Sequence, residues 1–248
     1  PGGAGTISRK AVSPEKERAY LQALHAILEE GQKALESGAS ALDVATTAVM
    51  RLEDCPMFNA GHGAVFNSDG KNELDASIMN GADLSAGAVA LLKHVRNPIL
   101  AARAVMESGL CVFMAGDSAD EFARSRGLDM VEQSYYFTQE RRDQLDKVKA
   151  VGGMHLMLDH DAENLAAEPA EPGSAFEGGE PIESLTKFGT VGAVALDLQG
   201  NLAAANSTGG LTNKIPGRIG DSAVIGAGCY AANATAAIAT TGTGATLI

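Results

Sequence analysis

The feature that most constrains this chain is a long acidic segment in its interior, between two parts that are rich enough in apolar residues to fold. Residues 160–187 read HDAENLAAEPAEPGSAFEGGEPIESLTK, with many Pro, Gly and Ala residues and little to bury. A loop of this length inside a compact domain is uncommon and is usually functional or disordered. We therefore expect a flexible acidic linker at 160–189, which divides a single domain into parts at 1–159 and 190–248.

Four helices are predicted before the linker. The first begins at Ser13, where a capping residue is followed by Pro14 and Glu15, a pattern typical of helix starts. In the second, Ser40 and Asp43 resemble a capping box. The other two have a capping residue at the start and a glycine at the end. The four are expected over 13–38, 40–52, 97–109 and 118–127.

Short apolar runs predict strands, most of them in the second half of the chain. They are expected at 86–92, 111–115, 191–198, 202–205, 223–225 and 236–241. Gln199-Gly200-Asn201 is typical of a tight turn between two paired strands. Because these runs are apolar without alternation, we expect sheets that are covered on both faces, in a layered α and β architecture.

Composition excludes several classes of function. The net charge of -12 disfavours nucleic acid and acidic membrane surfaces as partners, since both require clustered Lys and Arg. No apolar run reaches the length of about 18 residues that a membrane-spanning helix requires. The cysteines Cys55, Cys111 and Cys229 lie far apart, which predicts reduced thiols in a cytoplasmic protein and gives no zinc-ligand spacing.

The residues at the junction after the linker, Gly189 and Thr190, could together supply a cleavage site and a nucleophile. If the bond between Gly189 and Thr190 were cut, Thr190 would become a new N-terminus at the start of an apolar strand. Its hydroxyl could attack a carbonyl carbon, and its α-amino group, which titrates near pH ~8, could accept the proton. In the cleavage itself the attacked carbonyl is that of Gly189, which has no side chain to hinder the attack. On these residues alone, a Gly-Thr pair that simply begins a strand remains an alternative.

Further short sequence motifs are spread along almost the whole chain. They are GGAG at 2–5, FNAGHG at 58–63, ELDA at 73–76, STGGLTNK at 207–214, PGRIGDS at 216–222, GAGCY at 226–230 and TGTG at 241–244. With the junction at Thr190, they resemble the plant-type L-asparaginases, also called isoaspartyl peptidases. The resemblance implies an α+β fold, the αββα sandwich of N-terminal-nucleophile hydrolases, in which two sheets are flanked by helices. It also implies a homodimer of cleaved protomers.

The resemblance assigns roles at the nucleophile. Thr190 would be both the cleavage residue, after Gly189, and the catalytic nucleophile. Thr208 would support its hydroxyl and amine, and Asn59 would orient that amine. Thr241 and Gly242 would form the oxyanion hole through a hydroxyl and a backbone N–H. Without the flanking blocks, a turn would explain the TGTG segment and the residues around Asn59 equally well.

The resemblance also assigns the substrate contacts. Arg218 would bind the substrate α-carboxylate, because its planar guanidinium pairs with two oxygens at once. Asp221 would hold the α-ammonium group, and Gly244 would also contact the substrate. Without the flanking blocks, Arg218 and Asp221 would be read as a surface ion pair.

A structural sodium ion is implied near Asn59, and no cofactor is required for the chemistry. Main-chain oxygens would bind the ion, and oxygen ligands suit a hard cation. The matching carbonyl groups are those of Leu52, Glu53, Cys55, Phe58, Ala60 and His62.

The implied reaction is hydrolysis of L-asparagine, of β-aspartyl dipeptides, or of both, through an acyl-threonine intermediate to L-aspartate. A glycosylasparaginase is an alternative, although that relative usually has His-Asp before the threonine, where this chain has Phe188-Gly189. Pro1 and Ala245 depart from the family pattern. We expect this sequence to be truncated at both ends relative to the family. A truncated, non-catalytic relative is therefore a further alternative.

A dinucleotide-binding module is a rival of another class. GAGCYA at 226–231 fits the pattern G-x-G-x-x-A, which requires a following helix and an acidic residue about 20 residues further on. No Asp or Glu follows Ala231 in this sequence, which disfavours the rival.

Overall fold

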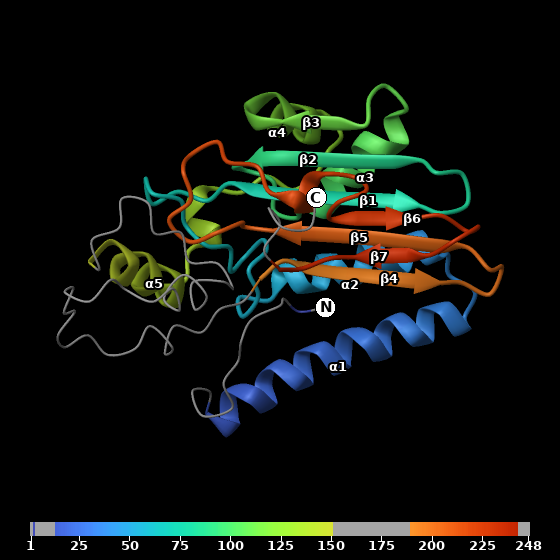
Figure 1. Ribbon diagram of the computed structural model, residues 1–248, viewed down its shortest axis with the longest axis horizontal. Helices are drawn as coiled ribbons and strands as arrows, with labels where there is room; N and C mark the ends of the chain where they lie inside the picture. The colour runs from blue at the N-terminus through green and yellow to red at the C-terminus, as the bar shows by residue number, and fades with distance from the viewer. Residues whose placement is uncertain (1, 3–12, 151–188, 243–248) are drawn as a thin grey trace, which may run out of the picture.

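The computed structural model describes residue 2 and residues 13–150 and 189–242. Of the features expected from sequence, the linker up to residue 188, Pro1, Gly244 and Ala245 lie outside this part of the chain. The helices are α1 (Pro14–Glu36), α2 (Ala41–Asp54), α3 (Pro98–Ser108), α4 (Gly116–Ser125), α5 (Gln139–Ala150) and the short 3₁₀ turns η1 (Gln133–Tyr136) and η3 (Asp221–Ala223). The strands are β1 (Leu74–Asn80), β2 (Ala86–Leu92), β3 (Phe113–Ala115), β4 (Val191–Leu196), β5 (Leu202–Thr208), β6 (Cys229–Ala231) and β7 (Ala237–Ala239) (Figure 1).

The larger sheet joins the two parts of the chain. Its strand order is β3-β2-β1-β5-β4, so that β5 lies between β1 from the first part and β4 from the second (Figure 1). The β2–β1, β1–β5 and β5–β4 pairings are antiparallel, and β3 pairs with β2 in parallel. A smaller sheet consists of β6 and β7. The two parts therefore form one layered unit in which β1 and β5 are hydrogen-bonded neighbours.

Alternate residues of the central strands belong to two different cores. Ala203 and Ala205 of β5 pack into the main core, together with α2 and α3. Ala204, between them, packs on Cys229 and Ala231 of β6 in a second, smaller core. Because successive side chains of a strand point to opposite faces, helices cover one face of the large sheet and the β6–β7 sheet lies on the other. The expected α+β class, with stacked layers and two sheets, is confirmed.

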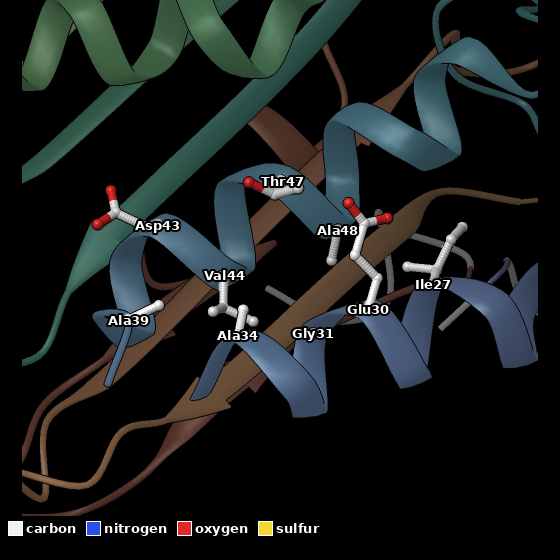
Figure 2. A pocket seen from close by; sticks show the side chains of 9 residues that line it. All are labelled: Ile27, Glu30, Gly31, Ala34, Ala39, Asp43, Val44, Thr47 and Ala48. Atoms are coloured by element: carbon white, nitrogen blue, oxygen red, sulfur yellow. The ribbon is translucent and has the colours of Figure 1, made fainter. Parts of the chain in front are cut away.

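Burial on both faces is confirmed for β1, β2 and β5, which are buried at nearly every position. At the edge strand β4, the side chains of Val194 and Leu196 are exposed, so one face is only partly covered. α1 lies outside α2, and a pocket separates them in part (Figure 2). The residues lining this pocket are Ile27, Glu30, Gly31, Ala34, Ala39, Asp43, Val44, Thr47 and Ala48.

All four predicted helices have the expected boundaries to within a few residues. Ser13 caps α1 by accepting a hydrogen bond from the backbone of Lys16, and Ser40 caps α2 in the same way. α3 ends at Gly109, which has a left-handed φ of 64°. The prediction that Ser118 caps the fourth helix is wrong. α4 begins two residues earlier because Gly116, with φ of 65°, makes the turn out of β3.

The strand predictions needed more correction. Residues 223–225 do not form a strand; the chain makes the 3₁₀ turn Asp221–Ala223 instead. β5 continues three residues beyond the predicted end, to Thr208. The hairpin between β4 and β5 is confirmed. β1, β6, η1 and α5 were not predicted. Because β6 follows Gly228 where a dinucleotide-binding motif requires a helix, the structure contradicts that rival.

Among the described residues, no helix combines the length and apolar character needed to cross a lipid bilayer.

Helix α3 packs tightly on the sheet at Gly87 of β2. A Cβ atom there would clash with the Ala102 carbonyl oxygen and lie 2.6 Å from the Met106 nitrogen, both in the backbone of α3. Gly87→Ala is therefore expected to lower the free energy of unfolding by roughly 3 kcal/mol, measured by chemical denaturation. Gly31→Ala is the control, because its Cβ would meet only a side-chain atom, Cγ1 of Val44, at 3.3 Å, and the change in the free energy of unfolding is expected to be below about 1 kcal/mol. Equal stability of both variants and the wild type would contradict this packing.

Candidate active site

Thr190 and Thr208 lie at the same end of the large sheet. β1 pairs Asp75 with Thr208, the last residue of β5, and β4 pairs its first residue, Val191, with Ser207. Continuing this register by one residue places Thr190 opposite Thr208. Thr190 and Thr208 are both buried. The pairing of β5 with its two neighbours therefore brings together residues from both parts of the chain.

The Thr190 hydroxyl has a partner that the sequence analysis missed. Its Oγ1 lies 2.9 Å from Oγ of Ser222, and either atom can donate the hydrogen bond. Ser222 is buried, and its carbonyl oxygen accepts a 2.6 Å hydrogen bond from the Ser77 hydroxyl on β1. The only signal in the sequence was the position of Ser222 directly after Asp221. The Thr208 hydroxyl, which was expected to support Thr190, accepts a hydrogen bond from the Gly210 backbone at 3.0 Å.

Asn59 packs against the chain that follows β5. Its side-chain nitrogen donates to the Gly210 carbonyl at 2.7 Å, and its side-chain oxygen accepts from the Val65 backbone at 3.0 Å. The backbone N–H of Gly209 donates to the Asn59 carbonyl at 3.0 Å. Asn59 therefore fixes the segment immediately beyond Thr208, and its expected contact with the amine of Thr190 stays a prediction.

Arg218 lies on the turn that leads into η3, and Asp221 is the first residue of η3. The guanidinium of Arg218 is close to two glycines, since a Cβ added at Gly220 or at Gly210 would lie 3.1 or 3.4 Å from its Nη1. Asp221 is only 8% exposed, which disfavours the alternative of a surface ion pair. Burial raises the pKa of the Asp221 carboxyl, and the positive charge of Arg218 opposes that rise. The turn thus presents a cation and a partly desolvated acid, as recognition of a zwitterion requires.

The residues expected to form the oxyanion hole follow β7. The backbone N–H of Thr240 donates to the Gly228 carbonyl at 2.9 Å, and the Asn206 side chain of β5 donates to the Thr240 carbonyl at 3.0 Å. Thr241 and Gly242 come next, and Gly242 has φ of 145°, which favours glycine. The anchor at Thr240 fixes where this segment begins. The oxyanion role of Thr241 and Gly242 stays a prediction, and Gly244 lies outside the described residues.

The loop after α2, where a sodium ion is expected, has a closely packed main chain. A Cβ at Gly61 would lie 2.5 Å from the Glu53 carbonyl oxygen, and one at Gly63 would nearly touch the carbonyl oxygen of Phe58. The Glu53 carbonyl already accepts a hydrogen bond from the His62 backbone at 2.7 Å, which folds the loop back on the end of α2. These carbonyl groups fit an oxygen-only site for a hard cation. The six-carbonyl ligand set itself stays a prediction.

Ser222 offers a direct test of the geometry around Thr190. The resemblance assigns cleavage of the Gly189–Thr190 bond to the Thr190 hydroxyl, and Ser222→Ala removes the hydroxyl that contacts it. A lost hydrogen bond of this kind corresponds to roughly a 3- to 10-fold slower cleavage, followed as the fraction of cut chain over time. Ser222→Thr keeps a hydroxyl, and Ser125→Ala changes an exposed serine as a control. Unchanged cleavage in Ser222→Ala would contradict a role for this contact.

Comparison with known proteins agrees with the fold. The family model described as Asparaginase matches residues 1–248. The isoaspartyl peptidases of Escherichia coli (strain K12) and Salmonella typhimurium are each 52% identical over 247 residues, which is 100% of this chain and 71% and 73% of theirs. An isoaspartyl peptidase/L-asparaginase of Rattus norvegicus is 39% identical, over 100% of this chain and 65% of its own. This chain belongs to the asparaginase family of N-terminal-nucleophile hydrolases, whose fold is an αββα sandwich.

Proposed function

We propose that this protein is an amidohydrolase that activates itself by cleavage before Thr190 and then hydrolyses L-asparagine, β-aspartyl dipeptides, or both. The product common to these reactions is L-aspartate. The observation that carries the proposal is the buried Thr190 hydroxyl, which contacts the hydroxyl of Ser222, and Ser222 follows Arg218 and Asp221 closely in the chain. The names of the curated relatives, isoaspartyl peptidase and L-asparaginase, support the same pair of substrates.

The first reaction is cleavage of the chain. The Thr190 hydroxyl attacks the carbonyl carbon of Gly189, the peptide C–N bond breaks, and an ester to the threonine oxygen forms while the nitrogen takes up a proton. Water then hydrolyses the ester. The products are a carboxylate at Gly189 and a free α-amino group at Thr190, next to the hydroxyl it must assist. Gly189 suits this step because it has no side chain beside the carbonyl that is attacked.

The second reaction uses the new amino group. In our proposal Arg218 holds the α-carboxylate of the substrate, and Asp221 holds its α-ammonium group. The Thr190 hydroxyl attacks the side-chain amide or isopeptide carbon, and its proton passes to the α-amine. Thr241 and Gly242 stabilise the oxyanion. Ammonia or an amino acid leaves, and water hydrolyses the acyl-threonine ester to release L-aspartate.

The oligomeric state, ion binding and cellular location of the enzyme are part of the same proposal. We expect a homodimer of cleaved protomers and a structural sodium ion on the loop after α2, as the resemblance implies. The three free cysteines suit a reducing compartment, and we therefore propose a cytoplasmic location. In this arrangement the sodium-binding carbonyls would stiffen the loop that holds Asn59 against Gly210.

The decisive test of the chemistry changes only the hydroxyl. Thr190→Ala is expected to abolish both cleavage and hydrolysis, because the variant has no nucleophilic oxygen. Thr190→Ser keeps the oxygen and is expected to retain measurable cleavage and turnover. The release of L-aspartate from L-asparagine and from a β-aspartyl dipeptide is measured for both variants beside the wild type. Hydrolysis by Thr190→Ala at the wild-type rate would overturn the proposal.

The buried acid Asp221 predicts how substrate binding depends on pH. Ionised Asp221 is required to hold an ammonium group, and burial raises its pKa. As the pH falls through that raised pKa, the acid takes up a proton and loses its charge, while the substrate ammonium remains charged. KM for L-asparagine is therefore expected to rise at pH values above ~3.9, where an exposed Asp would still be ionised.

Asp221→Asn provides the control for the pH experiment. Its KM is expected to be high and nearly independent of pH, so that the two curves converge at low pH. Loss of the Asp221 charge is expected to change KM, whereas protonation of the Thr190 amine lowers kcat as the pH falls. The two effects can therefore be distinguished. A wild-type KM that stays constant down to pH ~4 would contradict the role of Asp221.

A further inference from the structure

Two acidic side chains at the start of β1 reach towards the turn that presents Arg218. Glu73 lies directly before β1, and Asp75 is its second residue, so the two side chains leave the same side of the strand. Glu73 is 6% exposed and Asp75 is fully buried. The reaction steps described above use neither of them. Charged groups this deep in a protein normally have a defined partner.

Their partners are backbone N–H groups on either side of Arg218. The N–H of Gly217 donates to both carboxylate oxygens of Glu73, at 3.2 and 3.1 Å. The N–H of Gly220 donates to Oδ2 of Asp75 at 3.4 Å. The two acids therefore hold the chain on each side of the residue that is expected to bind the substrate α-carboxylate.

A buried lysine completes the arrangement. Lys214 is fully buried, and its ammonium group donates to the Glu73 carbonyl at 2.8 Å. Burial lowers the pKa of Lys214, while the nearby negative charges of Asp75 and Glu73 favour its charged form. Lys214 thus offsets part of the negative charge of the two acids and fixes the start of the turn to the start of β1.

Among residues 13–150 and 189–242, little else holds the outer side of the turn. Ile215, Pro216, Gly217 and Ile219 are exposed, and Gly217 has a left-handed φ of 84°. The Arg218 guanidinium lies close to Gly210 and Gly220, where an added Cβ would approach its Nη1 to 3.4 and 3.1 Å. A small shift at either glycine would therefore move the guanidinium, and a planar, two-point contact with a carboxylate tolerates such a shift poorly.

We propose that Glu73 and Asp75 are positioning residues, which act through Gly217 and Gly220 to aim Arg218 at the substrate α-carboxylate. This inference rests on the proposed function for the identity of the substrate. The loop contacts themselves stand on the hydrogen bonds described above. Neither acid touches Thr190, Ser222 or the Gly189–Thr190 bond in these contacts, so both should affect substrate binding more than chain cleavage.

Asparagine cannot replace Asp75 in this arrangement. One carboxylate oxygen accepts from Gly220, and the other accepts from the N–H of Leu91 at 3.0 Å. An amide has one acceptor side and one donor side, so Asp75→Asn leaves one of the two N–H groups facing another donor. At Glu73 a single N–H is shared by both oxygens, so Glu73→Gln keeps an acceptor and Glu73→Ala does not.

The experiment compares Glu73→Ala, Glu73→Gln and Asp75→Asn with the wild type. The exposed acids Glu132 and Asp129 supply the controls Glu132→Gln and Asp129→Asn, which make the same chemical changes on the surface. Three quantities are measured on the full chain: amide hydrogen exchange at Gly217 and Gly220, the rate of cleavage before Thr190, and kcat and KM for L-asparagine and a β-aspartyl dipeptide.

We expect faster exchange at Gly217 in Glu73→Ala. In Asp75→Asn we expect it at Gly220, because the amide oxygen should keep the shorter bond, the one from Leu91. In both variants KM should rise about tenfold, as for loss of one hydrogen bond to a charged group, with kcat and cleavage within about threefold of the wild type. Glu73→Gln and both controls should resemble the wild type. Parallel losses of kcat, cleavage and stability, or an unchanged KM with faster exchange, would overturn the positioning role.

Two outcomes separate this inference from the proposed function. A wild-type protein that hydrolyses neither substrate would overturn the proposed function, and the exchange rates would then decide whether the acids hold the turn. If Asp75→Asn does not fold, the pair Glu73→Ala and Glu73→Gln carries the test, since only the alanine variant loses the acceptor. Equal exchange at Gly217 in those two variants would overturn the inference.

Discussion

The antiparallel pairing of β5 with β1 on one side and β4 on the other is the constraint on which the site depends. It joins two parts of the chain that the acidic segment separates in sequence, and it sets a register in which Asp75 faces Thr208 and Val191 faces Ser207. A shift of one residue would turn every side chain on β5 to the opposite face and exchange the residues that β5 contributes to the two cores. The position of Thr190 is thus fixed by strand pairing that extends well beyond the site.

Around this pairing the chain buries polar groups that a purely structural core would avoid. Asp75 and Lys214 are fully buried, and Ser222 and Thr208 are almost fully buried. Burying charges carries a penalty that is repaid only by good geometry and further hydrogen bonds, and it is weak evidence for stability. Here each charged group contacts the backbone of the Arg218 turn or of its neighbours. We interpret the buried charges as groups that hold that turn in place.

The sequence predicted those parts of the fold that carry local signals. Caps at Ser13 and Ser40, the glycine at Gly109 and the hairpin turn after β4 act over a few residues, and they placed three helices and one strand pair. β1 and β6 have no such signal, because their strands form by pairing with distant segments. The start of α4 was missed because Gly116, rather than a capping side chain, sets it.

The candidate site could be predicted as a set of motifs but not as a geometry. The resemblance identified Thr190, Arg218 and Asp221 as candidates, since motif order is a property of sequence. Ser222 and the role of Glu73 could not be found this way, because their contacts join residues far apart in the chain. Their contacts become evident only in the folded structure, where η3 and the Arg218 turn lie against β1.

In the proposed activation, Thr190 becomes the N-terminus of a second polypeptide. The test is to incubate the purified protein near neutral pH and then determine its intact mass and N-terminal sequences. We expect two fragments, one of which begins Thr190-Val191-Gly192, with masses that sum to the uncut chain plus one water. A single uncut chain that is nevertheless folded and hydrolyses L-asparagine would contradict the proposed activation, because hydrolysis would then proceed without the Thr190 amine.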